Sequence, residues 1–72
     1  MVYAEDPLAQ AERHVREGEE RVARQTALVA RMTARRLDPT EAELILGRLR
    51  TSLRLQREHL TRLARDRGPP AA

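Results

Sequence analysis

Two histidines, His14 and His59, are the side chains of this 72-residue chain best suited to chemistry at neutral pH. Imidazole titrates close to neutrality and binds metal ions as a neutral ligand. If the chain folds back on itself, the two histidines come to neighbouring turns with Glu17 and Glu58 nearby, and a zinc site can be drawn. Neither helix has an HExxH or HxxxH pattern, so we favour a packing role and predict no metal and no cofactor.

Other catalytic patterns are missing from the sequence. The chain has no cysteine, no Gly-rich phosphate loop and no GxSxG, and neither Ser52 nor any of the four threonines has a base at convincing spacing. A core filled with leucine and valine also leaves no cavity for a small-molecule substrate. The sequence therefore predicts a protein that is not an enzyme.

The charge of the chain is uneven. Its fourteen basic residues are all arginine and face eleven acidic residues, a net charge of +3. Residues 48–67 hold seven arginines and two acidic residues, which leaves +5 in that stretch. Arg50, Arg54 and Arg57 form a stripe that could contact phosphates of a nucleic acid. The alternatives are pairing with acidic residues of the same chain and a composition typical of a GC-rich genome.

Two segments read as helices because both are rich in Ala, Leu, Arg, Glu and Gln and neither has an internal proline. Asp6 before Pro7 and Asp38 before Pro39 are N-cap signals, since proline suits the first helical position and aspartate the cap. The predicted organisation is one helical hairpin over residues 1–72: a helix over about 7–36, a turn at about 37–38, a helix over about 39–67 and a frayed tail over 68–72.

A period of seven in both segments predicts an antiparallel, coiled-coil-like pairing of the two helices. In the first segment the period joins Leu8, Val15, Val22 and Val29, with Ala11, Gly18, Gln25 and Met32 three positions later. In the second segment the corresponding residues are Leu46, Leu49, Leu53, Gln56, Leu60 and Leu63. We expect the apolar members of these two seams to form the core and the interface between copies, and Gly18 to mark a close approach of the helices.

With a bend near residues 37–38, residue i lies level with residue 75 − i. This register places the acidic residues Glu17, Glu19 and Glu20 near the arginines of the second helix, whereas Glu17 and Arg21 form an i,i+4 pair within the first. Gln25 and Gln56 fall at core positions, where a polar side chain can set register or reach water at an edge. The sequence does not decide between these two roles.

Apolar residues also lie outside the seams, and two helices touching along one line cannot cover them. They are Leu28, Ala30, Leu44, Ile45 and Leu55. Burying a leucine or isoleucine stabilises a protein by about 1.5–3 kcal/mol. We therefore predict that two hairpins pair into a four-helix bundle, a homodimer, with a tetramer or a helical protein partner as the alternatives.

The sequence shows no sign of a membrane-spanning segment, a secretory signal or a membrane-binding surface. No stretch approaches the roughly 18 apolar residues of a membrane span. The first residues, Met1 to Pro7, lack the basic and apolar regions of a secretory signal. Acidic residues lie among the arginines, and neither helix carries bulky aromatics on an apolar face, so a membrane surface is not an expected partner. The expected location is cytoplasmic.

The segment from Ala11 to Gln25, AERHVREGEERVARQ, resembles short hypothetical proteins common in alphaproteobacteria, as does the stretch from Leu55 to Leu60 that ends in Arg-Glu-His-Leu. The resemblance covers most of residues 11–63 and implies a cytosolic bacterial protein with no catalytic residues. The family pattern would have a Gly-rich or Asp-rich turn between the helices, and this chain departs from it with Arg35-Arg36-Leu37-Asp38-Pro39.

Overall fold

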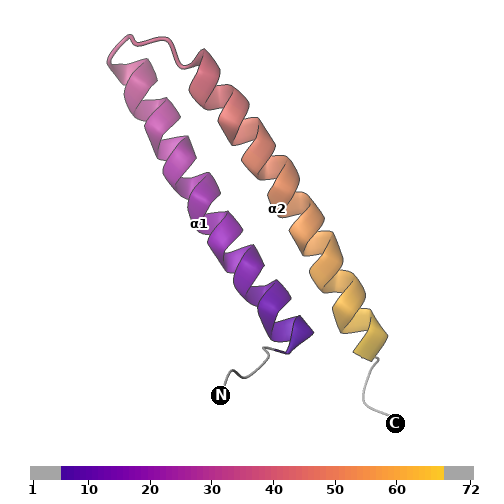
Figure 1. The fold of residues 1–72 in the computed structure, drawn as a ribbon. Coiled ribbons are helices and arrows are strands. Elements are labelled where there is room, and N and C mark those ends of the chain that lie inside the picture. The colour runs from indigo at the N-terminus through magenta and orange to yellow at the C-terminus, as the bar shows by residue number, and fades with distance from the viewer. Residues whose placement is uncertain (1–5, 68–72) are drawn as a thin grey trace, which may run out of the picture.

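The computed structural model describes residues 6–67, and within that range it consists of two helices and no strand. Helix α1 runs over Pro7–Ala34 and helix α2 over Thr40–Arg67. Each has 28 residues and is therefore about 42 Å long. The helices run in opposite directions and are joined by a short turn at one end (Figure 1). The prediction of an all-α helical hairpin is confirmed.

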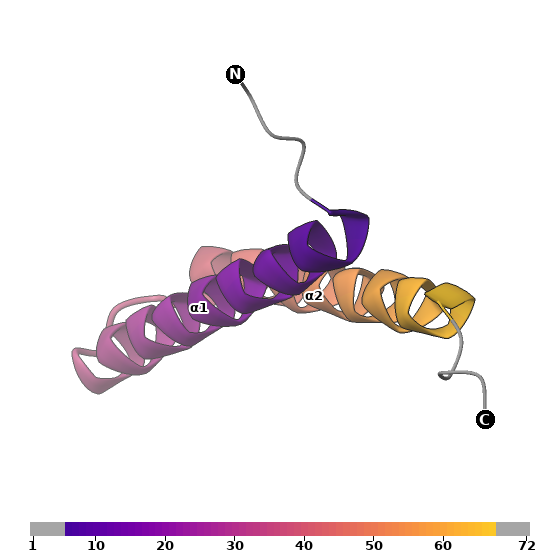
Figure 2. The same ribbon diagram turned by 90° about the horizontal axis from the view of Figure 1, so that it is seen from below.

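The hairpin is long and thin. Its radius of gyration is 16.8 Å, whereas a compact chain of this length has about 11 Å. The view along the hairpin shows that the two helix axes cross at an angle (Figure 2). Each helix has only the other as a neighbour, so the core can be no more than one strip along each helix.

That strip contains the seam residues that the sequence singles out. The buried residues are Ala11, Val15 and Gly18 of α1 and Ala42, Leu46 and Leu53 of α2. Half-buried are Leu8, Val22, Val29 and Met32 of α1 and Leu49, Leu60 and Leu63 of α2. Ala42 was not among the predicted residues, although it lies seven positions before Leu49 and so continues the same period.

Helix α1 is shorter at its C-terminal end than the predicted range of about 7–36. It stops at Ala34 because Arg36 adopts a left-handed conformation with φ of 60°. The N–H of Arg36 donates to the carbonyl of Thr33 at 3.1 Å, and the N–H of Leu37 donates to the carbonyl of Met32 at 2.9 Å. This pair of bonds is a Schellman motif, which satisfies the last carbonyls of the helix.

We expect Arg36→Gly to raise the melting temperature by about 4–8 °C, because a left-handed L-residue costs roughly 1 kcal/mol that glycine avoids. The matched control is Arg35→Gly, which removes the same charge at a residue with φ of −90°. Glycine gains nothing there and should leave stability unchanged or lower. Thermal unfolding followed by circular dichroism measures both, and a lower melting temperature for Arg36→Gly would contradict the motif.

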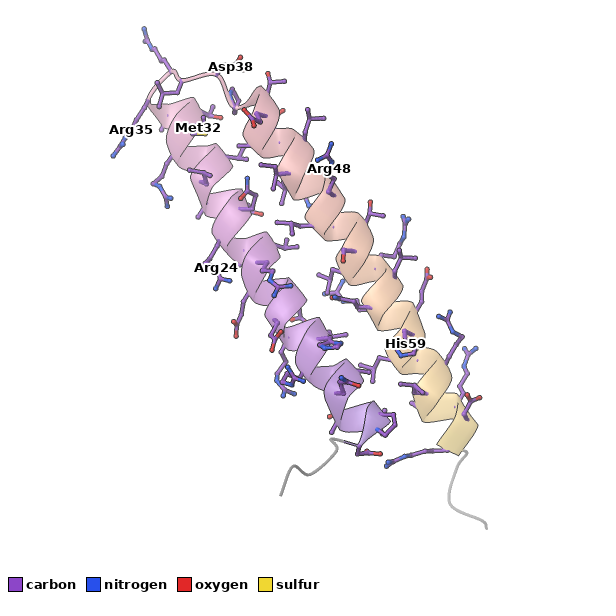
Figure 3. The ribbon with its side chains drawn as sticks, viewed as in Figure 1. Arg24, Met32, Arg35, Asp38, Arg48 and His59 are labelled. Carbon is purple, nitrogen blue, oxygen red and sulfur yellow. The ribbon has the colours of Figure 1, made fainter. Side chains whose placement is uncertain are left out.

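Helix α2 begins at Thr40, one residue after the predicted start at Pro39, and the predicted side-chain cap, Asp38, is present. Asp38 Oδ1 accepts hydrogen bonds from the backbone N–H of Thr40 at 3.0 Å and from its hydroxyl at 2.6 Å. The carbonyl of Pro39 accepts the N–H of Glu43 at 2.8 Å, which makes the first turn. Figure 3 shows Asp38 in the turn, directly before α2. Asp38 thus ends the turn and starts the helix.

The start of α1 differs from the predicted cap in one respect. Asp6 occupies the N-cap position with Pro7 at the first helical position, but its side chain makes no capping hydrogen bond within the described residues. Asp6 Oδ2 instead accepts a hydrogen bond from Arg67 at 2.6 Å. The carboxylate is drawn to the guanidinium because the antiparallel hairpin brings the start of α1 beside the end of α2 (Figure 1).

Replacing Asp38 by alanine should lower the melting temperature at neutral pH by about 5 °C, the usual effect of losing an N-cap in a small domain. The hydrogen bonds from the Thr40 hydroxyl and N–H lower the pKa of the Asp38 carboxyl. Since the pKa is lower in the folded state, the carboxylate stabilises the fold above about pH 4, and this stabilisation is lost as the pH falls through the folded pKa.

Melting temperatures measured from about pH 7 down to pH 2 should therefore converge for the unmodified chain and Asp38→Ala. Asp38→Asn is the control, because asparagine also caps helices but carries no charge to titrate. Equal melting temperatures for the unmodified chain and Asp38→Ala at pH 7 would contradict the role of the cap.

Neither α1 nor α2, over the residues that the structure describes, is long and apolar enough to cross a membrane.

Candidate functional site

Large apolar side chains remain exposed on α2, on the side that faces away from α1. Leu44 is 61% exposed and Leu55 is 54% exposed. Leu44 lies two residues before the buried Leu46, and Leu55 lies two residues after the buried Leu53. A step of two residues in a helix is a rotation of about 200° around its axis. Because Leu46 and Leu53 face α1, Leu44 and Leu55 face away from it.

Leu44 and Leu55 also lie on the same side as each other. They are eleven positions apart, which is about three turns of helix. Between them is a shallow, mostly apolar depression, open to solvent. We refer to its lining residues as the outer face of α2: Leu44, Gly47, Arg48, Thr51, Ser52 and Leu55. Figure 3 marks Arg48 in the half of α2 nearer the turn.

Gly47 lies in the middle of this face, and nothing within the hairpin explains it. A Cβ built at Gly47 would meet no atom within 4 Å. Glycine inside a helix destabilises it by about 1 kcal/mol relative to alanine. Gly47 therefore lowers the stability of α2 without avoiding any clash inside the hairpin. Gly47 also makes the centre of the outer face flat, since its neighbours Thr51 and Ser52 are small.

Gly18 in α1 is different, because its missing side chain is required by packing. A Cβ at Gly18 would lie 2.6 Å from Gln56 Oε1 and 3.1 Å from Leu53 Cδ1. The close approach predicted at Gly18 is therefore present. The Leu53 side chain packs on α1 at this point.

The two core glutamines have different surroundings. Gln25 Nε2 donates to the backbone carbonyl of Ala42 at 3.0 Å, a bond that ties the register of α1 to α2. Gln56 Oε1 is buried and has no hydrogen-bond partner within the described residues. Gln25 thus acts on register, one of the two roles that the sequence left open, whereas Gln56 contributes an unsatisfied acceptor at the Gly18 contact.

Ion pairs lie beside the seam, and most of their side chains are at least half-exposed to solvent. Arg57 lies 3.8 Å from Glu19 across the two helices, as the predicted antiparallel register requires. Within α1, Glu17 pairs with Arg13 at 3.2 Å and with Arg21 at 4.0 Å. Exposed pairs of this kind contribute about 0–1 kcal/mol each. They support the register of the hairpin rather than its stability.

The arginines predicted to contact phosphates are exposed, and two of the three share a surface hollow. Arg54 and Arg57 line it, whereas Arg50 does not. The other residues of this hollow are Glu58, Thr61, Arg62 and Arg65. Arg62 and Arg65 were not among the three arginines predicted from the sequence to contact phosphates. A carboxylate, Glu58, lies within the same hollow and reduces its positive charge.

The histidines are exposed on the surface of the hairpin, His14 on α1 and His59 on α2. Figure 3 marks His59. Among residues 6–67, no group of three or more His, Cys, Asp or Glu side chains could hold a metal ion. The outer face of α2 is therefore the candidate site that the geometry supports best.

No family model matches the chain, and no curated protein and no solved structure is significantly similar to it. The resemblance of residues 11–63 to short alphaproteobacterial proteins stays a prediction.

Proposed function

We propose that this chain is a small, non-enzymatic cytoplasmic protein whose activity is to self-associate, two hairpins pairing into a four-helix homodimer. The observation that carries the proposal is the outer face of α2, where Leu44 and Leu55 are 61% and 54% exposed on either side of a flat apolar depression. Exposed apolar patches that are rimmed by polar residues often mark sites of protein–protein interaction.

The surface area of the hairpin supports the same proposal. The chain exposes 5994 Å², whereas a compact monomer of its 8.2 kDa mass exposes about 4,500 Å². An elongated chain of two helices therefore leaves more surface for a second copy to cover than a compact monomer of the same mass would.

The energetics point the same way. Only five apolar side chains are buried in the described part of the hairpin: Ala11, Val15, Ala42, Leu46 and Leu53. Two of them are alanines, so the core of a single hairpin is small for a chain of this length. Covering the exposed parts of two leucines on each copy would stabilise a dimer by about 3–7 kcal/mol before the cost of association is subtracted.

Sedimentation or light scattering over a concentration series tests the proposal. We expect the mass to approach twice 8.2 kDa at high concentration and to fall on dilution. A mass of four chains would replace the dimer with a tetramer. A single-chain mass at every concentration would overturn self-association, and a helical protein partner would then be the remaining candidate for this face.

Nucleic-acid binding is the second candidate function, favoured by the hollow that Arg54, Arg57, Arg62 and Arg65 share. Arginines spaced along one side of a helix can follow a phosphate backbone, and such binding weakens steeply with salt. The test is titration of generic duplex DNA and RNA across a salt series. Absence of binding at about 50 mM salt would remove this candidate.

A further inference from the structure

Resting on the proposed self-association, we propose how the two copies join: α2 packs on α2 of the second copy in antiparallel orientation. In this arrangement Leu44 of each copy contacts Leu55 of the other, and the flat centre at Gly47 and Thr51 lies near the two-fold axis. The two copies of α2 then lie in the middle of the assembly, with one α1 on each outer side.

The outer face is complementary to itself in this orientation. A two-fold interface brings the same patch of both copies together, so each contact occurs twice. When Leu44 is level with Leu55 of the second copy, residues whose numbers add to 99 are level with one another along α2. Gly47 is then level with Ser52, and Arg48 with Thr51. The two copies of Arg48 lie three positions apart along the interface, and their aliphatic stems let the guanidinium groups extend to solvent at the edge of the face.

Parallel pairing of the same faces is less favourable because of charge. It would set Arg48 level with Arg48, Glu58 with Glu58 and Arg62 with Arg62 of the second copy. Antiparallel pairing separates both Glu58 and Arg62 from their counterparts, because the two copies of each residue then lie toward opposite ends of the interface.

Two like charges do become level in the antiparallel pair, Glu41 and Glu58. They are seventeen positions apart in the helix, which places them about 100° from each other around its axis. They therefore lie at opposite edges of the face, and the antiparallel pair does not bring them together.

Gly47 acquires a role in this interface that it lacks in the hairpin. Helices pack with their axes about 8–10 Å apart, and the short end of that range needs small residues at the contact. A Cβ at Gly47 is unobstructed within the hairpin, so the space it leaves free is available only to something outside the chain. The second copy of α2, pressing on the flat centre between two leucine contacts, fits that space.

Cysteine cross-linking tests the arrangement, because the chain has no cysteine of its own. The variants are Leu44→Cys, Leu55→Cys and, as a control on the exposed side of α1, Ala27→Cys. A disulfide needs Cα atoms within about 7 Å. We expect oxidation to cross-link a mixture of Leu44→Cys and Leu55→Cys chains, and to leave each variant alone, and Ala27→Cys, largely uncross-linked.

The mass of each chain in solution under reducing conditions, where no disulfide can form, separates the two proposals. The antiparallel α2 interface is wrong if Leu44→Cys or Leu55→Cys alone cross-links as well as the mixture. It is also wrong if nothing cross-links in chains that still sediment as dimers. In both cases self-association stands. If the unmodified reduced chain is monomeric, self-association itself fails.

A second variant, Gly47→Leu, tests the role of the glycine. Because a side chain at Gly47 meets nothing in the hairpin, the helical circular dichroism of the variant should equal or exceed that of the unmodified chain. Its dimer dissociation constant should rise at least tenfold. A dissociation constant that stays unchanged or falls would overturn the proposed interface.

Discussion

Replacing Leu53 by alanine is expected to lower the melting temperature of the hairpin by about 10–40 °C, corresponding to a loss of about 2–5 kcal/mol in the free energy of unfolding. Leu53 is 5% exposed, and its Cδ1 lies against Gly18, 3.1 Å from where a Cβ would be. The loss should fall at the upper end of the range, because the residue opposite is a glycine with no side chain that could move into the cavity.

Thermal unfolding followed by circular dichroism measures this effect. Leu53→Met is the matched control, since it keeps the volume and the apolar character and should cost less than about 1.5 kcal/mol. If Leu53→Ala melts within about 3 °C of the unmodified chain, the helices do not depend on their contact at Gly18.

The double substitution of Leu44 and Leu55 by glutamate should convert the protein from a dimer to a monomer. Four leucines leave the proposed interface and four carboxylates enter it, so the dissociation constant should rise by more than about 1,000-fold. The hairpin itself should survive, because both leucines face solvent in the single chain and glutamate is a good helix former. Sedimentation velocity gives the mass, and circular dichroism gives the helix content.

The matched control for this double variant is Ala23→Glu with Ala27→Glu, which adds the same charge on the exposed side of α1. The control should remain a dimer. If both double variants lose dimerisation equally, added charge rather than the outer face of α2 is responsible, and if neither does, the interface lies elsewhere.

Much of the fold follows from simple periodicity. The heptads of leucine and valine predicted two helices and the strip along which they touch, and Asp38 followed by Pro39 predicted the start of α2. Gly18 at a seam position predicted the close approach that the distances to Gln56 and Leu53 display. These features are local, or they repeat at a fixed spacing, so a single sequence carries enough information to find them.

Three features could not be predicted, each for a physical reason. Arg36 takes a conformation that normally marks glycine, and no residue pattern signals an arginine there. The Asp6 side chain bonds Arg67 rather than its own helix, a choice that depends on where α2 ends. Leu28 was grouped with Leu44 and Leu55 as uncovered, yet it is half-buried because the crossing helices cover part of it.

The outer face of α2 could be predicted only in part. The sequence indicated that Leu44 and Leu55 were outside the seam, but their shared direction depends on the helix remaining unbroken through Gly47. The depression between them depends on the absence of a side chain at that glycine. The sequence shows that these leucines lie outside the seam, whereas the structure shows that they share one side of α2 with a depression between them.

The dependence of the melting temperature on protein concentration tests most directly whether a second copy covers α2. If unfolding is coupled to dissociation, the melting temperature of the unmodified chain should rise by about 5–10 °C over a hundredfold increase in concentration, whereas that of the Leu44→Glu, Leu55→Glu chain should not change. A melting temperature of the unmodified chain that is independent of concentration, together with a single-chain mass, would show that the exposed leucines of α2 need no second copy.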